Sequence, residues 1–300
     1  MRVNPNMVPD MLAAIQQSEQ SLQTALQQVS TGKSVTLPSD NPAAEANMVQ
    51  NTIETANVDQ YTQNASSALS MVQTADSALS SVVSSLTSAI SLGTEGANGT
   101  NSSANQQAIA TQVQGILSSV VSQANLSYQG VYVFGGTAST TTPYTVDSTA
   151  QSGYTYNGNT DVNSVSVGDK MSVQVNIPGS QIFSNPSANV LGSLSSLVTA
   201  LQSGDTSAIS TATAAVSSAM NYVSQQRVVY GNAESQLNSQ ETYLQQETVS
   251  LSSQATSLVG VDMATAATTL SQAETDNNAA LAAAAKVVPN SLLNYLSTPS

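Results

Sequence analysis

Eight apolar residues recur at strict seven-residue spacing in the second half of the chain, and this row limits the fold more than any other feature. The row consists of Ile209, Val216, Val223, Tyr230, Leu237, Leu244, Leu251 and Leu258. Apolar residues at this spacing lie along one face of an α-helix that packs against other helices. They predict a helix over residues 206–259, roughly 80 Å long at ~1.5 Å per residue. We expect such a rod in an elongated molecule.

A similar seam predicts a helix at the N-terminal end. Glu19 interrupts one of its two apolar rows, and Gly32 is a suitable residue to end the helix. The seam consists of Val8, Ile15, Leu22 and Val29, with Leu12 and Leu26 at the companion positions.

The segment 37–42 separates this helix from the next one. Asp40 or Asn41 can cap the new helix, and Pro42 suits its first position. The helical pattern continues to about Ile90, and the glycine-rich stretch 93–101 predicts a loop. The apolar positions of this second helix are Leu69, Val83 and Ile90 in one row and Val72, Leu79 and Leu86 in the other.

Three further helices complete the helical pattern. One follows the loop with Ile109 and Val113 on its apolar face, and a short one covers 190–201. The last begins after Gly260 and Asp262 and is expected to end near Pro289.

Between residues 128 and 186 the apolar period changes from helical to two. Tyr154 and Tyr156 alternate before the turn 157–158, and Val165 precedes a second turn at 168–169. We expect short antiparallel strands joined by tight turns.

These patterns predict a mainly α fold, an elongated helical rod bundle with coiled-coil terminal helices and a small antiparallel β insertion. We expect a terminal assembly domain (1–37 and 260–300), a helical rod domain (38–130 and 187–259) and a β-rich insertion domain (131–186). The rods can bury their seams against each other, but the terminal segments have no other predicted element to cover them. They are therefore expected to pack against helices of partner subunits.

Composition excludes several functions. The chain has 5 basic and 18 acidic residues, a formal charge of -13, so it lacks the clustered cations that bind nucleic acid. It has no cysteine and therefore no thiol nucleophile, and it has no histidine, the residue most used for proton transfer near neutral pH and the commonest metal ligand. We expect no enzyme activity, no catalytic residues, no cofactor and no metal.

Two short motifs are better explained by structure than by chemistry. Residues 31–34, Thr-Gly-Lys-Ser, match the end of a P-loop, but Gln27 stands where that motif needs glycine. Ser30 and Lys33 match the Ser-x-x-Lys spacing of penicillin-recognising enzymes without the companion motifs. The N-terminus lacks a signal-peptide pattern, and the apolar run 281–288 is too short to cross a membrane, so no membrane insertion is expected.

The two ends of the chain resemble the flagellins and flagellar hook-associated proteins. Residues 28–33 (Gln-Val-Ser-Thr-Gly-Lys) with 38–43 (Pro-Ser-Asp-Asn-Pro-Ala) resemble their N-terminal signature. Residues 261–266 resemble the element that opens their last helix, and 227–237 resemble their rod motif, although Asn238 follows Leu237 where the family has Asn before it. Residues 130–136, the start 1–3 and the finish 291–296 are most similar to the proteins that join hook and filament.

This resemblance implies a structural subunit that is exported through the flagellar type III apparatus and located in the extracellular flagellum. The implied partners are flagellin, the other junction protein (hook-associated protein 1), further copies of the chain in a ring, and a cytoplasmic export chaperone. The assembly interface expected from the seams consists of Val8, Leu12, Ile15, Leu22, Leu26, Val29, Met263, Leu270, Leu281, Val288, Leu292, Leu293 and Leu296.

Two other functions stay open at this point. The chain could be a minor flagellin, distributed along the whole filament. It could also be a surface module whose insertion binds carbohydrate through Tyr144, Tyr154 and Tyr156.

Overall fold

The computed structural model describes residues 7–35, 37, 39 and 41–296. The chain forms two compact units, residues 1–57 with 247–300 and residues 58–246. The helices are α1 (Met7–Thr31), α2 (Pro42–Gly96), α3 (Ser103–Ala124), α4 (Gly179–Ile182), α5 (Val190–Ser203), α6 (Thr206–Val259) and α7 (Met263–Leu296). The strands are β1 (Ser127–Tyr128), β2 (Val131–Tyr132), β3 (Tyr144–Val146), β4 (Tyr154–Tyr156), β5 (Ser164–Ser166) and β6 (Ser172–Gln174).

Helix α6 has the bounds that the row of eight apolar residues predicts. The row is buried from Ile209 to Leu251, and only Leu258 is half-buried. The mainly α fold with a small antiparallel β insertion is confirmed. Because most of this row is buried within the chain, the rod helices cover each other's apolar residues and leave little apolar surface at these positions.

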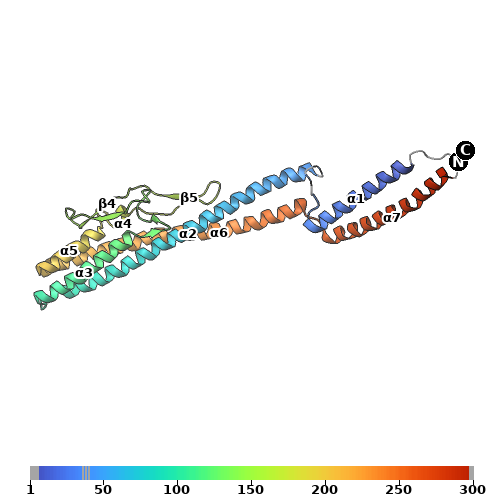
Figure 1. Cartoon of the computed structure of the whole chain (residues 1–300). Helices are drawn as coiled ribbons and strands as arrows, with labels where there is room; N and C mark the ends of the chain where they lie inside the picture. The colour runs from blue at the N-terminus through green and yellow to red at the C-terminus, as the bar shows by residue number, and fades with distance from the viewer. Residues whose placement is uncertain (1–6, 36, 38, 40, 297–300) are drawn as a thin grey trace. The chain divides into compact units, whose positions relative to one another are not determined.

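In the first unit, α1 and α7 lie side by side and antiparallel (Figure 1). Gly32 ends α1 in the left-handed conformation (φ 67°), and its N–H donates to the carbonyl of Gln28. The N–H of Val261 then donates to the carbonyl of Gly32 at 3.0 Å, so the chain entering α7 is tied to the chain leaving α1. The end of α1 and the start of α7 are therefore held next to each other.

Two helices extend past their predicted ends. Helix α2 continues beyond Ile90 to Gly96, and α7 continues beyond Pro289 to Leu296. The expected loop at 93–101 is wrong for residues 93–96, which are helical. Glycine is needed here because Thr213 packs where a Cβ of residue 93 would be, and Leu201 packs where a Cβ of residue 96 would be. These glycines serve close helix packing, which sequence alone does not separate from a turn.

The expected helix starts are confirmed where they are described. The Oδ1 of Asn41 accepts from the N–H of Ala44 at 3.1 Å at the start of α2, whereas the alternative cap Asp40 lies outside the described residues. At the start of α7, the Oδ1 of Asp262 accepts from the N–H of Ala264 at 3.0 Å.

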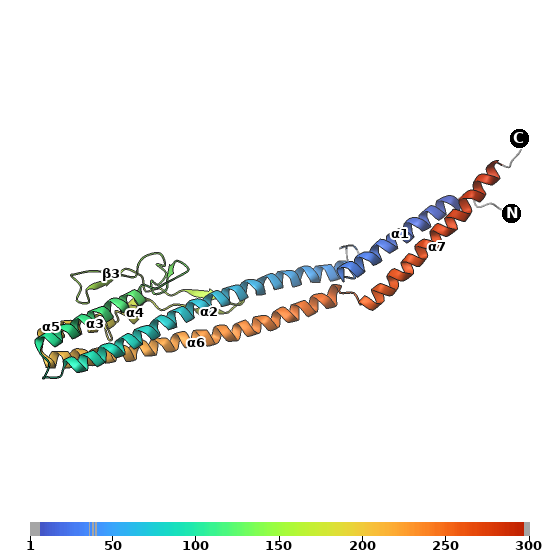
Figure 2. The same cartoon turned by 60° about the horizontal axis from the view of Figure 1, so that its bottom comes forward.

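In the second unit, α2 and α6 run side by side and α3 packs against α5 (Figure 2). The buried face of α2 includes Val72, Leu79 and Leu86, as predicted, whereas the predicted row through Leu69, Val83 and Ile90 is only partly buried. Alanines take most of the remaining core positions of this helix. They are Ala65, Ala68, Ala75, Ala78 and Ala89.

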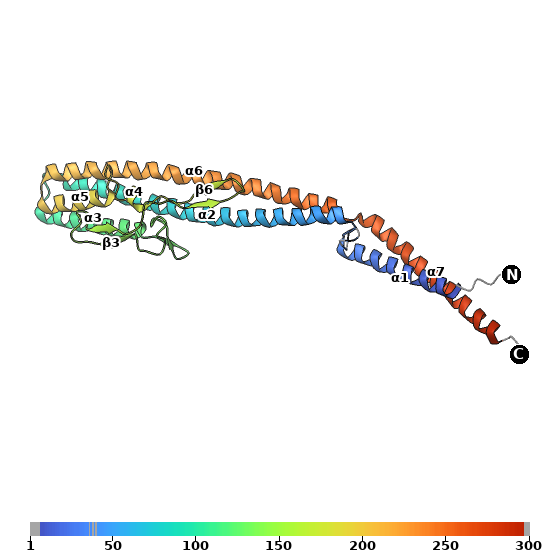
Figure 3. The same ribbon diagram turned by 90° about the horizontal axis from the view of Figure 1, so that it is seen from above.

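Residues 127–174 form three separate antiparallel hairpins, β1–β2, β3–β4 and β5–β6, of which Figure 3 labels the strands β3 and β6. The turn at 168–169 joins β5 and β6 as expected. The turn expected at 157–158 does not join two paired strands, because β4 pairs with the preceding β3 across residues 147–153. Tyr144 is 2% exposed and stacks edge-on against Phe183, so it offers no face to a sugar ring.

Candidate assembly interface

The predicted interface residues of the first unit fall into two groups. Ile15, Leu22, Val29 and Leu270 are partly buried along the contact of α1 with α7. Leu12, Leu26, Met263 and Leu281 are 57%, 48%, 51% and 47% exposed. The side chains of Val8, Val288, Leu292, Leu293 and Leu296 lie outside the described part of the chain.

Small residues form the centre of this contact. Ala25, Ala266 and Ala273 are 2%, 2% and 7% exposed, and among residues 9–31 and 263–286 they are the most buried apolar side chains of α1 and α7. Sequence reasoning missed them because it searched for large apolar residues. The seven-residue spacing of Ala266 and Ala273 could have identified these two residues. It places both on one face of α7, and side chains as small as alanine let two helices approach closely.

A polar layer interrupts the same contact. The Oγ of Ser18 on α1 and the Nδ2 of Asn277 on α7 are buried and make no hydrogen bond. A buried polar group without a partner costs about 1–3 kcal/mol. With alanines in place of large side chains and two such groups, the α1–α7 pair is held together weakly.

A groove of about 720 Å³ runs along one side of the pair. Its lining residues are small or uncharged, except for Asp276. The carboxylate of Asp276 accepts a hydrogen bond from the Nε2 of Gln272 at 2.8 Å. The lining comprises Ala14, Gln17, Ser18, Ser21, Thr268, Thr269, Gln272, Ala273 and Asp276.

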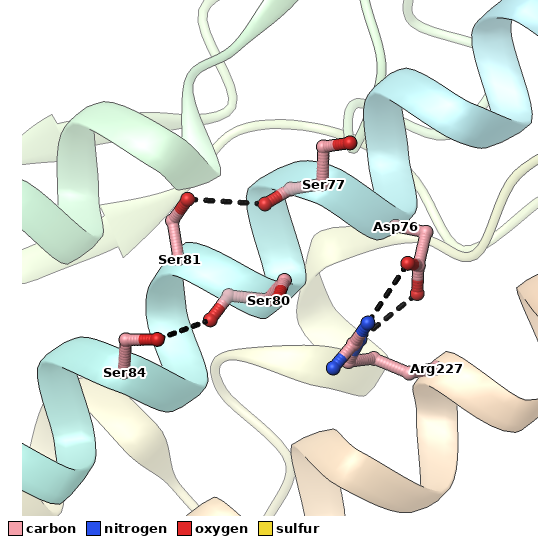
Figure 4. Close-up of polar contacts among 6 residues, drawn as sticks. All are labelled: Asp76, Ser77, Ser80, Ser81, Ser84 and Arg227. Atoms are coloured by element: carbon pink, nitrogen blue, oxygen red, sulfur yellow. Dashed lines mark hydrogen bonds and ion pairs between the residues drawn. The ribbon is translucent and has the colours of Figure 1, made fainter.

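The second unit carries the chain's rod motif. Arg227 on α6 makes hydrogen bonds to both carboxylate oxygens of Asp76 on α2, which Figure 4 shows as two parallel dashed lines. These bonds raise the pKa of Arg227 above its ordinary value. The serines beside this pair, such as Ser81 bonding to the carbonyl of Ser77, satisfy themselves on their own helix. The pair therefore connects the two long helices, while its serine neighbours do not.

Tyr230 attaches the insertion to the rod. It is 2% exposed, and its hydroxyl accepts a hydrogen bond from the N–H of Ile177 at 3.0 Å. Burial raises the pKa of Tyr230 well above its ordinary value. The tyrosine occupies the fourth position of the heptad row of α6, so one residue serves both the helical core and the anchoring of the insertion.

Among residues 7–35, 37, 39 and 41–296, no group of acidic side chains is arranged to hold a metal ion. In the same part of the chain, no helix combines the length and the hydropathy of a membrane span.

A pair of long terminal helices with exposed leucines, attached to a rod with a buried seam, defines a helical structural subunit. Two family models match this chain: the bacterial flagellin N-terminal helical region over residues 3–139 and the bacterial flagellin C-terminal helical region over residues 213–296. The chain belongs to the flagellin family, and it is a structural subunit of the bacterial flagellum.

Solved structures share the fold. A Vibrio parahaemolyticus protein assigned as a flagellar hook-associated protein is 21% identical with a TM-score of 0.68, over 73% of this chain and 99% of that one. FlgL from Bacillus cereus is 23% identical with a TM-score of 0.60, over 69% and 99%. The flagellar junction protein FlgL from Legionella pneumophila is 15% identical with a TM-score of 0.60, over 71% and 100%. No curated protein sequence matches the chain.

Proposed function

We propose that this chain is a subunit of the junction between hook and filament, equivalent to hook-associated protein 3. The support is that the solved structures with this fold include proteins described as FlgL and as a flagellar junction protein. The N-terminal and C-terminal motifs of the sequence favour the same group within the family. A minor flagellin has less support.

In this proposal each part of the chain has its own role. Residues 1–37 and 260–300 form the assembly domain, residues 38–130 and 187–259 form the rod, and residues 131–186 form an outward spacer. The assembly domain contacts further copies of the chain, flagellin on one side and hook-associated protein 1 on the other. The chain has a mechanical role without catalysis, and it reaches the cell exterior through the flagellar export apparatus with a cytoplasmic chaperone.

The observation that carries the proposal is the exposure of four large apolar side chains on the terminal helix pair. Leu12, Leu26, Met263 and Leu281 are each about half exposed in the single chain. Large apolar side chains exposed along one helix pair mark a surface that is covered by a partner. A subunit that is complete only in a polymer is expected to leave such a surface open.

The test is to locate the protein by immunogold labelling on isolated flagella. Labelling at one short zone next to the hook is expected, and labelling along the whole filament would identify a minor flagellin instead.

A deletion tests the assembly role. Removing residues 292–296 should abolish incorporation while the second unit stays folded. Removing the exposed turn residues 148 and 149 of the insertion is the matched control and should leave incorporation intact. Normal flagella without residues 292–296 would contradict the assembly role.

A further inference from the structure

The loop that joins α2 to α3 carries an exposed Asn–Gly pair, Asn98 and Gly99, at one end of the second unit (Figure 2). Thr100 beside it is exposed too, and a Cβ on Gly99 would meet no atom within 4 Å. Within the part of the chain that the structure describes, no atom accepts a hydrogen bond from the N–H of Gly99. The backbone nitrogen that follows Asn98 is therefore open to water and to the side chain of Asn98.

The side-chain amide of Asn98 is polarised by its neighbour. Its Oδ1 accepts hydrogen bonds from the N–H of Thr100 at 3.2 Å and from the hydroxyl of Thr100 at 3.0 Å. Two donors on one carbonyl oxygen make the attached carbon more electrophilic, and they stabilise negative charge that develops on that oxygen. An activated amide carbon thus lies next to an unblocked backbone nitrogen.

We propose that Asn98 is a site of spontaneous deamidation, in which the chain modifies itself without an enzyme. The backbone nitrogen of Gly99 loses its proton to a base in water and attacks the Cγ of Asn98, so that a new C–N bond forms. Negative charge moves to Oδ1, where the two donors of Thr100 stabilise it. The bond from Cγ to Nδ2 then breaks, and Nδ2 takes a proton from water and leaves as ammonia.

Water completes the reaction. It adds to either carbonyl of the succinimide ring that has formed, and the ring opens to aspartate or to isoaspartate. Overall one water molecule enters and one ammonia molecule leaves, and a neutral amide becomes a carboxylate. The sequence of steps consumes no oxidant, reductant or cofactor.

A second Asn–Gly pair in the same chain is held in a different way. The Nδ2 of Asn157 donates to the Oγ1 of Thr145 at 2.8 Å, and the N–H of Asn157 donates to the carbonyl of Pro143 at 2.8 Å. A Cβ on Gly158 would collide with the hydroxyl of Tyr156, so the backbone after Asn157 is closely packed. Because the amide of Asn157 is bound across the β3–β4 hairpin, we expect this residue to be protected.

Deamidation alters the loop as well as its charge. The main-chain carbonyl of Asn98 accepts a hydrogen bond from the N–H of Asn101 at 3.0 Å, in the turn that leads into α3. Isoaspartate lengthens the backbone of this turn by a carbon atom and breaks its geometry. The new carboxylate also lies just beyond the C-terminal end of α2, where negative charge is unfavourable and where Glu95 is already negative. The modified loop is therefore less stable than the original one.

Ageing of the purified full-length protein tests the proposal. The folded chain is incubated at mildly alkaline pH, with a parallel sample in urea, and both are then cut with chymotrypsin. Cleavage after Leu92 and Leu117 releases a fragment with the first Asn–Gly pair, and cleavage after Tyr156 separates the second pair from it. Mass spectrometry measures the exchange of amide for carboxyl in each fragment, and an isoaspartyl methyltransferase with labelled S-adenosylmethionine measures isoaspartate.

In the folded chain Asn98 should react about tenfold faster than Asn157 or more, because Asn157 first has to break its hydrogen bonds. In urea the two residues should react at similar rates, since the folded structure makes the difference. Equal rates in the folded chain, or an Asn98 that stays intact while both react in urea, would overturn the proposal.

Variants of the loop test the roles of its two neighbours. Gly99→Ala places a methyl group beside the attacking nitrogen and should slow the reaction by about tenfold. The φ of Gly99 is not positive and its surroundings are open, so alanine should leave the fold unchanged, which circular dichroism checks.

Thr100→Val removes one of the two donors to Oδ1 and should slow the reaction by about threefold to tenfold, the factor that one hydrogen bond is worth. Thr100→Ser keeps the hydroxyl and should restore the rate. Faster reaction in Thr100→Val would show that these hydrogen bonds restrain Asn98, and would overturn its activation by Thr100. All these rates are measured on the free protein, so they are independent of its place on the flagellum.

Discussion

Arg227 on α6 holds Asp76 on α2 through two hydrogen bonds of 2.9 Å each, one to each carboxylate oxygen. The side chains of the two residues are 34% and 28% exposed, so solvent screens their attraction. Within the described part of the chain this is the one ion pair that joins α2 to α6. It favours one alignment of two helices whose other contacts are mostly apolar and repetitive.

We predict that Arg227→Lys lowers the free energy of unfolding by about 0.5 kcal/mol, because lysine keeps the charge but loses the two-bond geometry. Urea unfolding followed by circular dichroism measures this loss, and the effect should shrink at high salt. Gln226→Lys is the matched control on the adjacent residue and should change stability less. A loss of several kcal/mol for Arg227→Lys would contradict the view that this pair sets alignment without dominating stability.

A larger effect is expected at Tyr230. The Tyr230→Phe variant leaves the N–H of Ile177 without an acceptor in a buried position, which costs about 1–3 kcal/mol. Hydrogen exchange at Ile177 should accelerate together with this loss. The exposed Tyr243→Phe is the control and should change neither quantity, and equal effects at the two positions would argue against the anchoring role of Tyr230.

Alkaline pH should destabilise the second unit through two buried tyrosines. Burial raises the pKa of Tyr144 and of Tyr230 in the folded chain, whereas both ionise near pH 10 once unfolded. Their stabilisation is therefore complete below about pH 10 and is lost as pH rises toward the folded-state pKa. Urea midpoints measured from pH 8 to pH 11.5 should fall above about pH 10, and the Tyr144→Phe/Tyr230→Phe variant should lose much of that slope.

The large-scale fold follows from the sequence because heptad spacing is a strong and local signal. The bounds of α6 and the end of α1 at Gly32 are confirmed. At two glycines tertiary packing overrides a local rule, because Gly93 and Gly96 resemble loop residues until Thr213 and Leu201 are placed against them. At the C-terminal end, Pro289 resembles a helix end although α7 continues to Leu296.

The candidate site was predicted less completely than the fold. The seam identified which large residues belong to the terminal helices, but it did not distinguish Leu22 from Leu12. In the structure Leu22 is partly buried against α7, whereas Leu12 is exposed. That distinction depends on how α1 and α7 rotate about their contact. The rotation is set by Ala25, Ala266 and Ala273, and alanine is too common in helices to be recognised from the sequence as a contact residue.

Asn277 offers a way to strengthen the terminal pair. In Asn277→Leu an apolar side chain of similar size replaces the unpaired amide, so the α1–α7 pair should gain about 1–3 kcal/mol. Hydrogen exchange across α1 should slow by a corresponding factor. The neighbouring Asn278→Leu, at an exposed position, is the matched control and should leave exchange unchanged. Faster exchange in Asn277→Leu would mean that the amide has a stabilising partner.

The exposed leucines should matter for assembly and not for folding. The double variant Leu12→Ala/Leu281→Ala removes two half-exposed side chains that the single chain does not bury. The free energy of unfolding of the monomer, measured by thermal unfolding, should therefore change by no more than about 0.5 kcal/mol. In the proposed assembly a neighbouring subunit covers the same side chains, and fully burying a leucine is worth about 1.5–3 kcal/mol. The double variant should therefore lose at least tenfold in incorporation into flagella, measured by quantitative immunoblotting against Gln20→Ala on the outward face of α1. Equal incorporation of both variants would show that Leu12 and Leu281 are not part of the interface.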